Sequence, residues 1–118
     1  MSDLESYTTT ITAGQSLSDA VPLGVKVLVG LSFDENWTSP TGGVTFQVSS
    51  DGVTFQEYYD GVAGTEILVP ASAAKSNQFV AMSNINQWGA VKLIKVRSGT
   101  AAAPVNQSST TTITVFVQ

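Results

Sequence analysis

Cysteine and histidine are both absent from this sequence of 118 residues. Without cysteine, the chain has no disulfides and no thiol nucleophile. Without histidine, Ser-His-Asp triads and His-ligated haem are excluded, and the two absences together exclude Cys/His zinc sites. We therefore expect no cofactor that depends on these side chains.

Charged residues are scarce as well, at 12% of the chain, with five basic and nine acidic side chains and a formal net charge of −4. A nucleic-acid-binding domain of this size is ordinarily basic, so we expect no nucleic-acid partner. All nine acids lie at or before Glu66 with one base, Lys26, and the other four bases follow. This asymmetry suits packing between copies, although solvated loops can also segregate charge by chance.

Long apolar runs are missing too. The longest, residues 21–31, is interrupted by Pro22, Gly24 and Lys26, so no membrane span is expected. The first six residues are polar and acidic, unlike a secretory signal, so no signal peptide is expected either.

What the sequence does contain is alternation of apolar and polar residues with a period of two, which is typical of strands with one buried face. Frequent Gly and Asp-Gly turn signals separate these segments, and no window has a convincing helical period beyond one turn at residues 71–75. The pattern predicts one all-β domain over residues 7–118, an antiparallel β-sandwich of jelly-roll or immunoglobulin-like type, after a flexible arm at residues 1–6. The predicted strands are residues 7–12, 25–33, 44–48, 53–56, 65–69, 79–82, 91–97 and 113–117.

Two local features qualify this pattern. The pentapeptide Gly-Val-Thr-Phe-Gln occurs at residues 43–47 and again at 52–56, which predicts a hairpin with two similar arms. The alternation slips at Leu93 and Ile94, as a bulge or burial on both faces would cause. Residues 34–43 and 99–109 form long irregular segments, and loops of this length are usually functional or packed against a neighbour.

Candidate chemistry is limited to carboxylates. Asp51 and Asp60 each precede glycine, where turn formation is the simpler explanation than calcium binding. Residues 34–36 are rich in oxygen but lack the spaced pattern of a calcium loop. Glu57, Asp60 and Glu66 are the nearest approach to a glycosidase pair, yet they lie on or beside a turn. We predict no catalytic, cofactor-binding or metal-ligating residues, and hence no enzyme.

Aromatic side chains are the candidates for binding. Trp88 is expected to close one end of the core. Trp37, in a polar loop, is either an exposed platform that stacks on a sugar or a buried anchor. Of the adjacent Tyr58 and Tyr59, one ring should be in the core and the other free, and Tyr58 is our second candidate for glycan stacking. Phe116 lies on the Thr-rich face of its strand, packed under a loop or in an interface.

Three stretches extend this interpretation to a family: residues 11–24 (ITAGQSLSDAVPLG), 44–60 (VTFQVSSDGVTFQEYYD) and 91–107 (VKLIKVRSGTAAAPVNQ). Together they resemble small virion proteins of tailed bacteriophages that decorate heads or form the base of head spikes and fibres. The third stretch is the most specific, because a strand ending Lys-Val-Arg-Ser-Gly-Thr before an Ala/Pro loop is uncommon. The acidic first half and the longer loop around Trp37 depart from that group.

The resemblance implies a non-enzymatic capsid decoration, or cement, protein. It would be made in the host cytoplasm and located on the outer surface of the virion head. Its partners would be the major capsid protein and copies of itself, with a homotrimer favoured because cyclic symmetry matches a symmetric shell. The alternatives are the base of a spike or fibre, with a fibre protein as partner, and an adhesion module for host-surface glycans. The candidate capsid or subunit contacts are Leu4, Tyr7, Trp37, Pro40, Ala102, Pro104, Val105 and Phe116.

Overall fold

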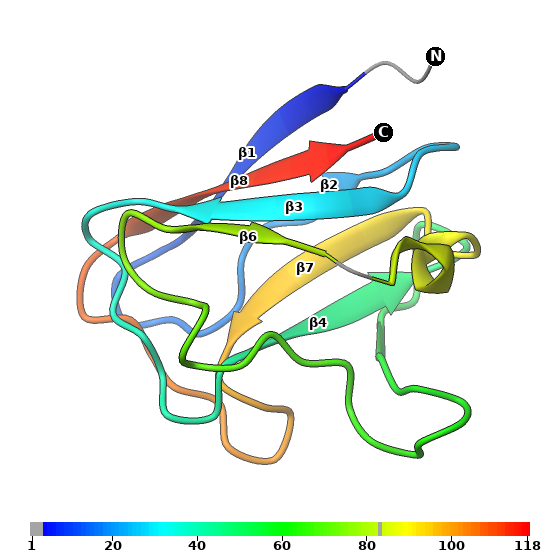
Figure 1. The fold of residues 1–118 in the computed structure, drawn as a ribbon. Helices are drawn as coiled ribbons and strands as arrows, with labels where there is room; N and C mark the ends of the chain where they lie inside the picture. The colour runs from blue at the N-terminus through cyan, green and yellow to red at the C-terminus, as the bar shows by residue number, and fades with distance from the viewer. Residues whose placement is uncertain (1–3, 83) are drawn as a thin grey trace.

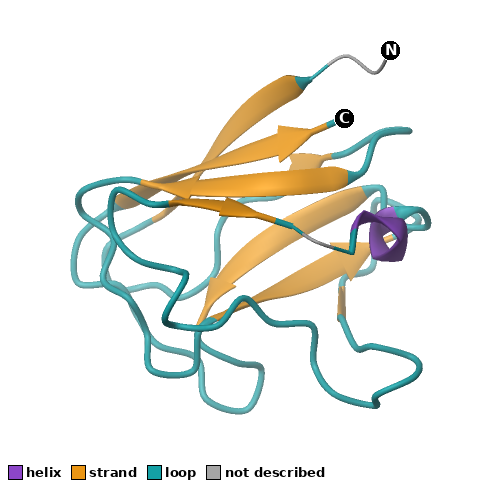
Figure 2. Cartoon of the chain, in the orientation of Figure 1, coloured by secondary structure: helices purple, strands orange, loops and turns teal. Residues whose placement is uncertain are grey.

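The computed structural model describes residues 4–82 and 84–118 as two four-stranded antiparallel sheets packed together (Figure 1; Figure 2). One sheet has the order β1-β8-β3-β6 and the other the order β2-β7-β4-β5. The predicted antiparallel β-sandwich is therefore confirmed. Its strands are β1 (Glu5–Ile11), β2 (Val21–Pro22), β3 (Leu28–Phe33), β4 (Val44–Ser49), β5 (Gln56–Glu57), β6 (Phe79–Ala81), β7 (Leu93–Ser98) and β8 (Thr111–Val117).

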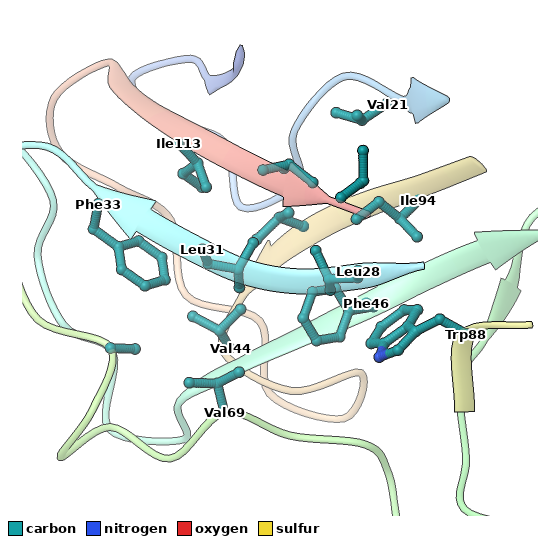
Figure 3. Close-up of a cluster of buried hydrophobic side chains, with 14 of the residues drawn as sticks. Val21, Leu28, Leu31, Phe33, Val44, Phe46, Val69, Trp88, Ile94 and Ile113 are labelled. Atoms are coloured by element: carbon teal, nitrogen blue, oxygen red, sulfur yellow. The ribbon is translucent and has the colours of Figure 1, made fainter. Parts of the chain in front are cut away.

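The core lies between the two sheets, where Leu28 and Leu31 of β3 lie toward Val44 and Phe46 of β4 (Figure 3). A short 3₁₀ helix, η1 (Ile85–Trp88), places the Trp88 indole at one end of this core. The indole is fully buried and meets the Phe46 ring edge-on at 5.0 Å between centroids. Trp88 closes the core as the sequence predicts.

A β-bulge changes the expected strand at residues 25–33. Val25 is fully exposed, because the chain turns at Leu23–Lys26 and the strand begins only at Leu28. The pairing of β3 with β8 shifts register between Leu28 and Gly30. The extra residue reverses the phase of the alternation, so that Leu28 and Leu31 both face the core. The prediction that Leu28 faces away from Leu31 and Phe33 is therefore wrong, because all three side chains are buried in the core.

The repeated pentapeptide does not form two similar arms. Residues 44–49 form β4, but its partner β5 has only two residues, with Gln47 opposite Glu57. The Asp51 carboxylate accepts hydrogen bonds from the Val53 and Thr54 amides at 2.8 and 2.9 Å, which holds the second copy in a turn. Val53 consequently stays 83% exposed. The predicted hairpin exists, but the predicted strand at 53–56 is wrong for all but its last residue.

The expected free arm is also shorter than predicted. Glu5 and Ser6 already belong to β1, opposite Val117 and Phe116 of β8. Residues 1–3 lie outside the described part of the chain. Residues 65–69 contribute isolated bridges in place of the predicted strand, and the sequence did not predict β2. The predicted bulge or two-sided burial at Leu93 is also not found. β7 pairs regularly with β4 through Leu93, whose side chain is half-buried.

Candidate functional site

The two long loops, residues 34–43 and 99–110, are tied together at one end of the sandwich by a single side chain. Gln107 is 1% exposed, and its amide donates to the Thr38 carbonyl at 2.8 Å and to Ser98 Oγ at 2.9 Å. Its Oε1 accepts the Thr38 amide at 2.9 Å. The two bonds to Thr38 join segments 69 residues apart, so the two loops form one unit, which we call the double loop (Figure 1).

Backbone bonds complete the double loop. Gly99 N–H donates to the Gly43 carbonyl at 2.8 Å, and Val105 N–H donates to the Ser98 carbonyl at 2.9 Å. Gly99 has φ +89°, and a Cβ there would lie 2.6 Å from the Ala103 carbonyl oxygen, so only glycine fits this close approach. The exposed tip that results contains Ala102, Pro104 and Val105, three of the predicted contact residues.

Two other predicted contacts in these loops are buried. Trp37 is 3% exposed, with its indole N–H donating to the Ala74 carbonyl at 2.9 Å and its ring 4.6 Å from that of Phe33. Pro40 is buried as well. Trp37 is thus the anchor of its loop, and its assignment as a sugar-stacking platform or surface contact is wrong, because its ring belongs to the buried core.

The adjacent tyrosines also exchange their expected roles. Tyr58 is half-buried: its hydroxyl donates to the Gln87 carbonyl and its ring meets the Trp88 ring at 5.0 Å. Burial raises the pKa of Tyr58, with the Asp60 charge adding to the effect. Tyr59 is the exposed ring, at 53%. The sequence shows that one ring is free but not which one, because β5 ends just before this pair.

Tyr59 stands between two open hollows. One, of about 460 Å³, is lined on its polar side by Asp60, Asn84 and Gln87. The other, of about 390 Å³, lies toward Glu57 and the Ser49–Ser50 turn. An exposed ring flanked by carboxylate and amide groups offers an apolar face beside hydrogen-bonding partners. Tyr59 is a surface aromatic that sequence analysis did not select as a candidate for glycan stacking.

The suggested carboxylate pair is bound to a buried arginine. Arg97 on β7 is 5% exposed, and its guanidinium binds both Glu57 oxygens, with Nη1 2.5 Å from Oε2 and Nη2 2.8 Å from Oε1. Glu66 Oε2 lies 3.2 Å from the same Nη1. The Arg97 guanidinium lowers the pKa of Glu57, whereas a general acid needs a raised one. The arrangement joins β5, β7 and the segment around Glu66.

Three aspartates among the candidates, Asp34, Asp51 and Asp60, stabilise turns. Asp60 Oδ1 accepts the Val62 and Ala63 amides, and these bonds lower the pKa of Asp60, as the Thr54 and Val53 amides do for Asp51. Asp34 accepts the Asn36 amide on one oxygen and the Thr112 amide on the other. Within residues 4–82 and 84–118, no group of three or more acidic side chains is placed to hold a metal ion.

The other predicted contacts lie on the β1-β8-β3-β6 sheet. Leu4 is 61% exposed, and Tyr7 is half-buried with its hydroxyl donating to Glu5. Phe116 is half-buried against Phe79 of β6, with ring centroids 5.0 Å apart. The Phe79 ring covers Gly30, where a Cβ would lie 2.7 Å from its edge. Phe116 therefore packs across β3 on an aromatic side chain of β6, and not under a loop.

No family model, curated protein or solved structure matches this chain. Among the described residues, no helix has the length and apolar character needed to cross a membrane.

Proposed function

We propose that this chain is a non-enzymatic structural protein of a tailed-bacteriophage virion, which decorates the outer surface of the head and stabilises the shell. Its partners would be the major capsid protein and further copies of itself. The resemblance of residues 11–24, 44–60 and 91–107 to such proteins supports this proposal.

The observation that carries it is the double loop. The most specific of the three stretches, residues 91–107, contains β7 and most of the second segment of the double loop, residues 99–110. Its exposed tip is held by buried hydrogen bonds of Gln107 and by backbone bonds. A contact surface ordered during folding loses little conformational entropy on binding. Several such weak contacts on one shell add up through avidity, which is how a small protein would oppose internal pressure.

The test adds the purified chain to heads of the phage that encodes it, after this protein has been removed from them. Val105→Asp at the exposed tip should reduce head occupancy at least about tenfold, because an aspartate in a contact region loses its hydration without a partner. Val25→Asp is the matched control, since Val25 is fully exposed in a turn at the opposite end of β3 (Figure 1). Wild-type chain that does not bind heads, or equal binding by both variants, contradicts the proposal.

A second candidate function, adhesion to glycans, is favoured by one observation: Tyr59 is 53% exposed between two hollows that carry Asp60, Asn84 and Glu57. Tyr59→Ala should abolish retention on a glycan array, whereas Tyr58→Phe, which keeps the buried ring, should not. If wild type binds no glycan on the array, this alternative is wrong.

A further inference from the structure

β1 is an unprotected sheet edge. It has seven residues, whereas β6, β2 and β5 at the other sheet margins have three, two and two. Natural proteins block such edges with lysine, proline or a bulge. β1 contains neither residue, and its register with β8 runs without a break from Glu5 to Ile11. Its one charge, Glu5, is balanced by Lys26 at 3.1 Å.

The direction of the backbone groups on this edge follows from one hydrogen bond. The Thr10 carbonyl accepts the Asp19 amide, which lies on the side away from β8. The N–H and C=O of one strand residue point to the same side, and successive residues alternate. Thr8, Ser6 and Leu4 therefore also direct their backbone groups to the open side, where no described residue bonds to them. Beyond Thr8 the edge is covered by Asp19.

We propose that residues 4–8, which are Leu4 and the open part of β1, pair with the same segment of a second copy in an antiparallel register centred on Ser6. Ser6 then lies opposite Ser6 of the second copy, and Leu4 opposite Thr8. All three are residues with free backbone groups, so the contact forms about six hydrogen bonds, two for each bonded pair. The two β1-containing sheets become one continuous sheet across a two-fold axis.

The side chains favour this register over the alternative registers centred on Glu5 or Thr8. Pairing about Ser6 keeps Leu4, Ser6 and Thr8 of both copies on one face and puts Glu5 opposite Tyr7 of the second copy. Tyr7 already donates a hydrogen bond to Glu5 within one chain, so the two side chains are chemically matched. A register centred on Glu5 would oppose two like charges, and one centred on Thr8 would need the Thr10 carbonyl that Asp19 occupies.

The first test is the native mass of this 118-residue chain in solution, which needs no capsid and so is independent of the proposed function. We expect twice the 12.3 kDa mass of the chain at micromolar concentration, or a larger even number of copies. Thr8→Pro should give the 12.3 kDa monomer with an unchanged circular dichroism spectrum, because the amide it removes faces away from β8. Thr8→Val, which keeps the amide, should remain a dimer.

The second test reads the register and does not depend on the proline variant folding. Because the chain has no cysteine, Ser6→Cys introduces the only thiol. Opposed residues in a bonded antiparallel pair have Cα atoms about 5.5 Å apart, within disulfide range. Oxidised glutathione should cross-link Ser6→Cys into a covalent dimer, and Thr10→Cys should stay uncross-linked. A wild-type monomer or trimer, a dimer that survives Thr8→Pro, or equal cross-linking at both positions would overturn the proposal.

Discussion

Replacing Arg97 with methionine tests whether the buried guanidinium holds the outer face of the β2-β7-β4-β5 sheet together. Methionine keeps most of the apolar stem but leaves Glu57 and Glu66 without their cation. Removing one partner of a buried ion pair costs about 3–5 kcal/mol. The Glu57 side chain is 36% exposed and regains water, whereas that of Glu66 is only 13% exposed. We therefore expect a loss of about 3 kcal/mol in the free energy of unfolding, at the low end of that range.

Urea denaturation at several pH values separates electrostatic from packing effects. Arg97 holds the pKa of Glu57 below its ordinary value near 4.5, so the stabilisation is present above that pH and is lost as the pH falls through the lower folded value. In Arg97→Met, acid protonates the Glu57 carboxylate, which has lost its cation, and this reduces the destabilisation of the variant. The difference between wild type and variant should therefore shrink below about pH 4.5.

Two variants make this experiment decisive. Adding Glu66→Gln to Arg97→Met should recover part of the loss, because it removes the more buried of the two uncompensated charges. Lys92→Met, which removes an exposed positive charge just before β7, should change stability by less than about 0.5 kcal/mol. A difference between wild type and Arg97→Met that stays constant from pH 7 to pH 4 would refute the electrostatic explanation and leave only lost packing.

Two further predictions concern the loops. Gln107→Leu removes three hydrogen bonds and leaves the buried Ser98 hydroxyl without its donor, so it should lower the free energy of unfolding by about 2–4 kcal/mol. It should also speed amide exchange across residues 34–43 in hydrogen-exchange mass spectrometry. Exchange that is unchanged from wild type would contradict the coupling of the two loops. Gly43→Ala should lower the melting temperature far more than Gly14→Ala, because both glycines have positive φ but only at Gly43 would a Cβ meet a carbonyl oxygen, that of Val69, at 2.3 Å. Equal shifts would show that backbone strain alone accounts for the loss.

The strands were predictable because alternation is a local signal. Residues 113–117 bury alternate side chains against the core and carry that pattern in their own sequence. Residues 44–48 carry the same apolar alternation, although Thr45 between Val44 and Phe46 is buried as well. The phase of residues 25–33 was not predictable in the same way, because the bulge at Leu28–Gly30 depends on the pairing with β8. The second pentapeptide failed for a different reason: the Asp51 carboxylate competes locally with strand pairing.

The candidate site was harder to predict, since its partners are far apart in the chain. The buried Trp37 donates its indole N–H to the Ala74 carbonyl, 37 residues away, and the sequence around Trp37 contains no signal for that partner. Gln107 has no periodic pattern around it, and its importance follows only from the arrival of Thr38 beside it. Arg97 could be singled out as the only arginine, but its pairing with Glu57 and Glu66 depends on the fold.

The way in which the double loop is held has a consequence for engineering. The Gln107 side chain and Gly99, which hold the double loop together, are buried, whereas Ala102, Pro104 and Val105 are exposed. Substitutions at these three positions should therefore change the exposed surface of the tip without destabilising the fold, as long as Gln107 and Gly99 are kept. If the tip is the contact surface that we propose, a combinatorial library for selecting new binders would be randomised at the same three positions, with Gln107 and Gly99 left unchanged.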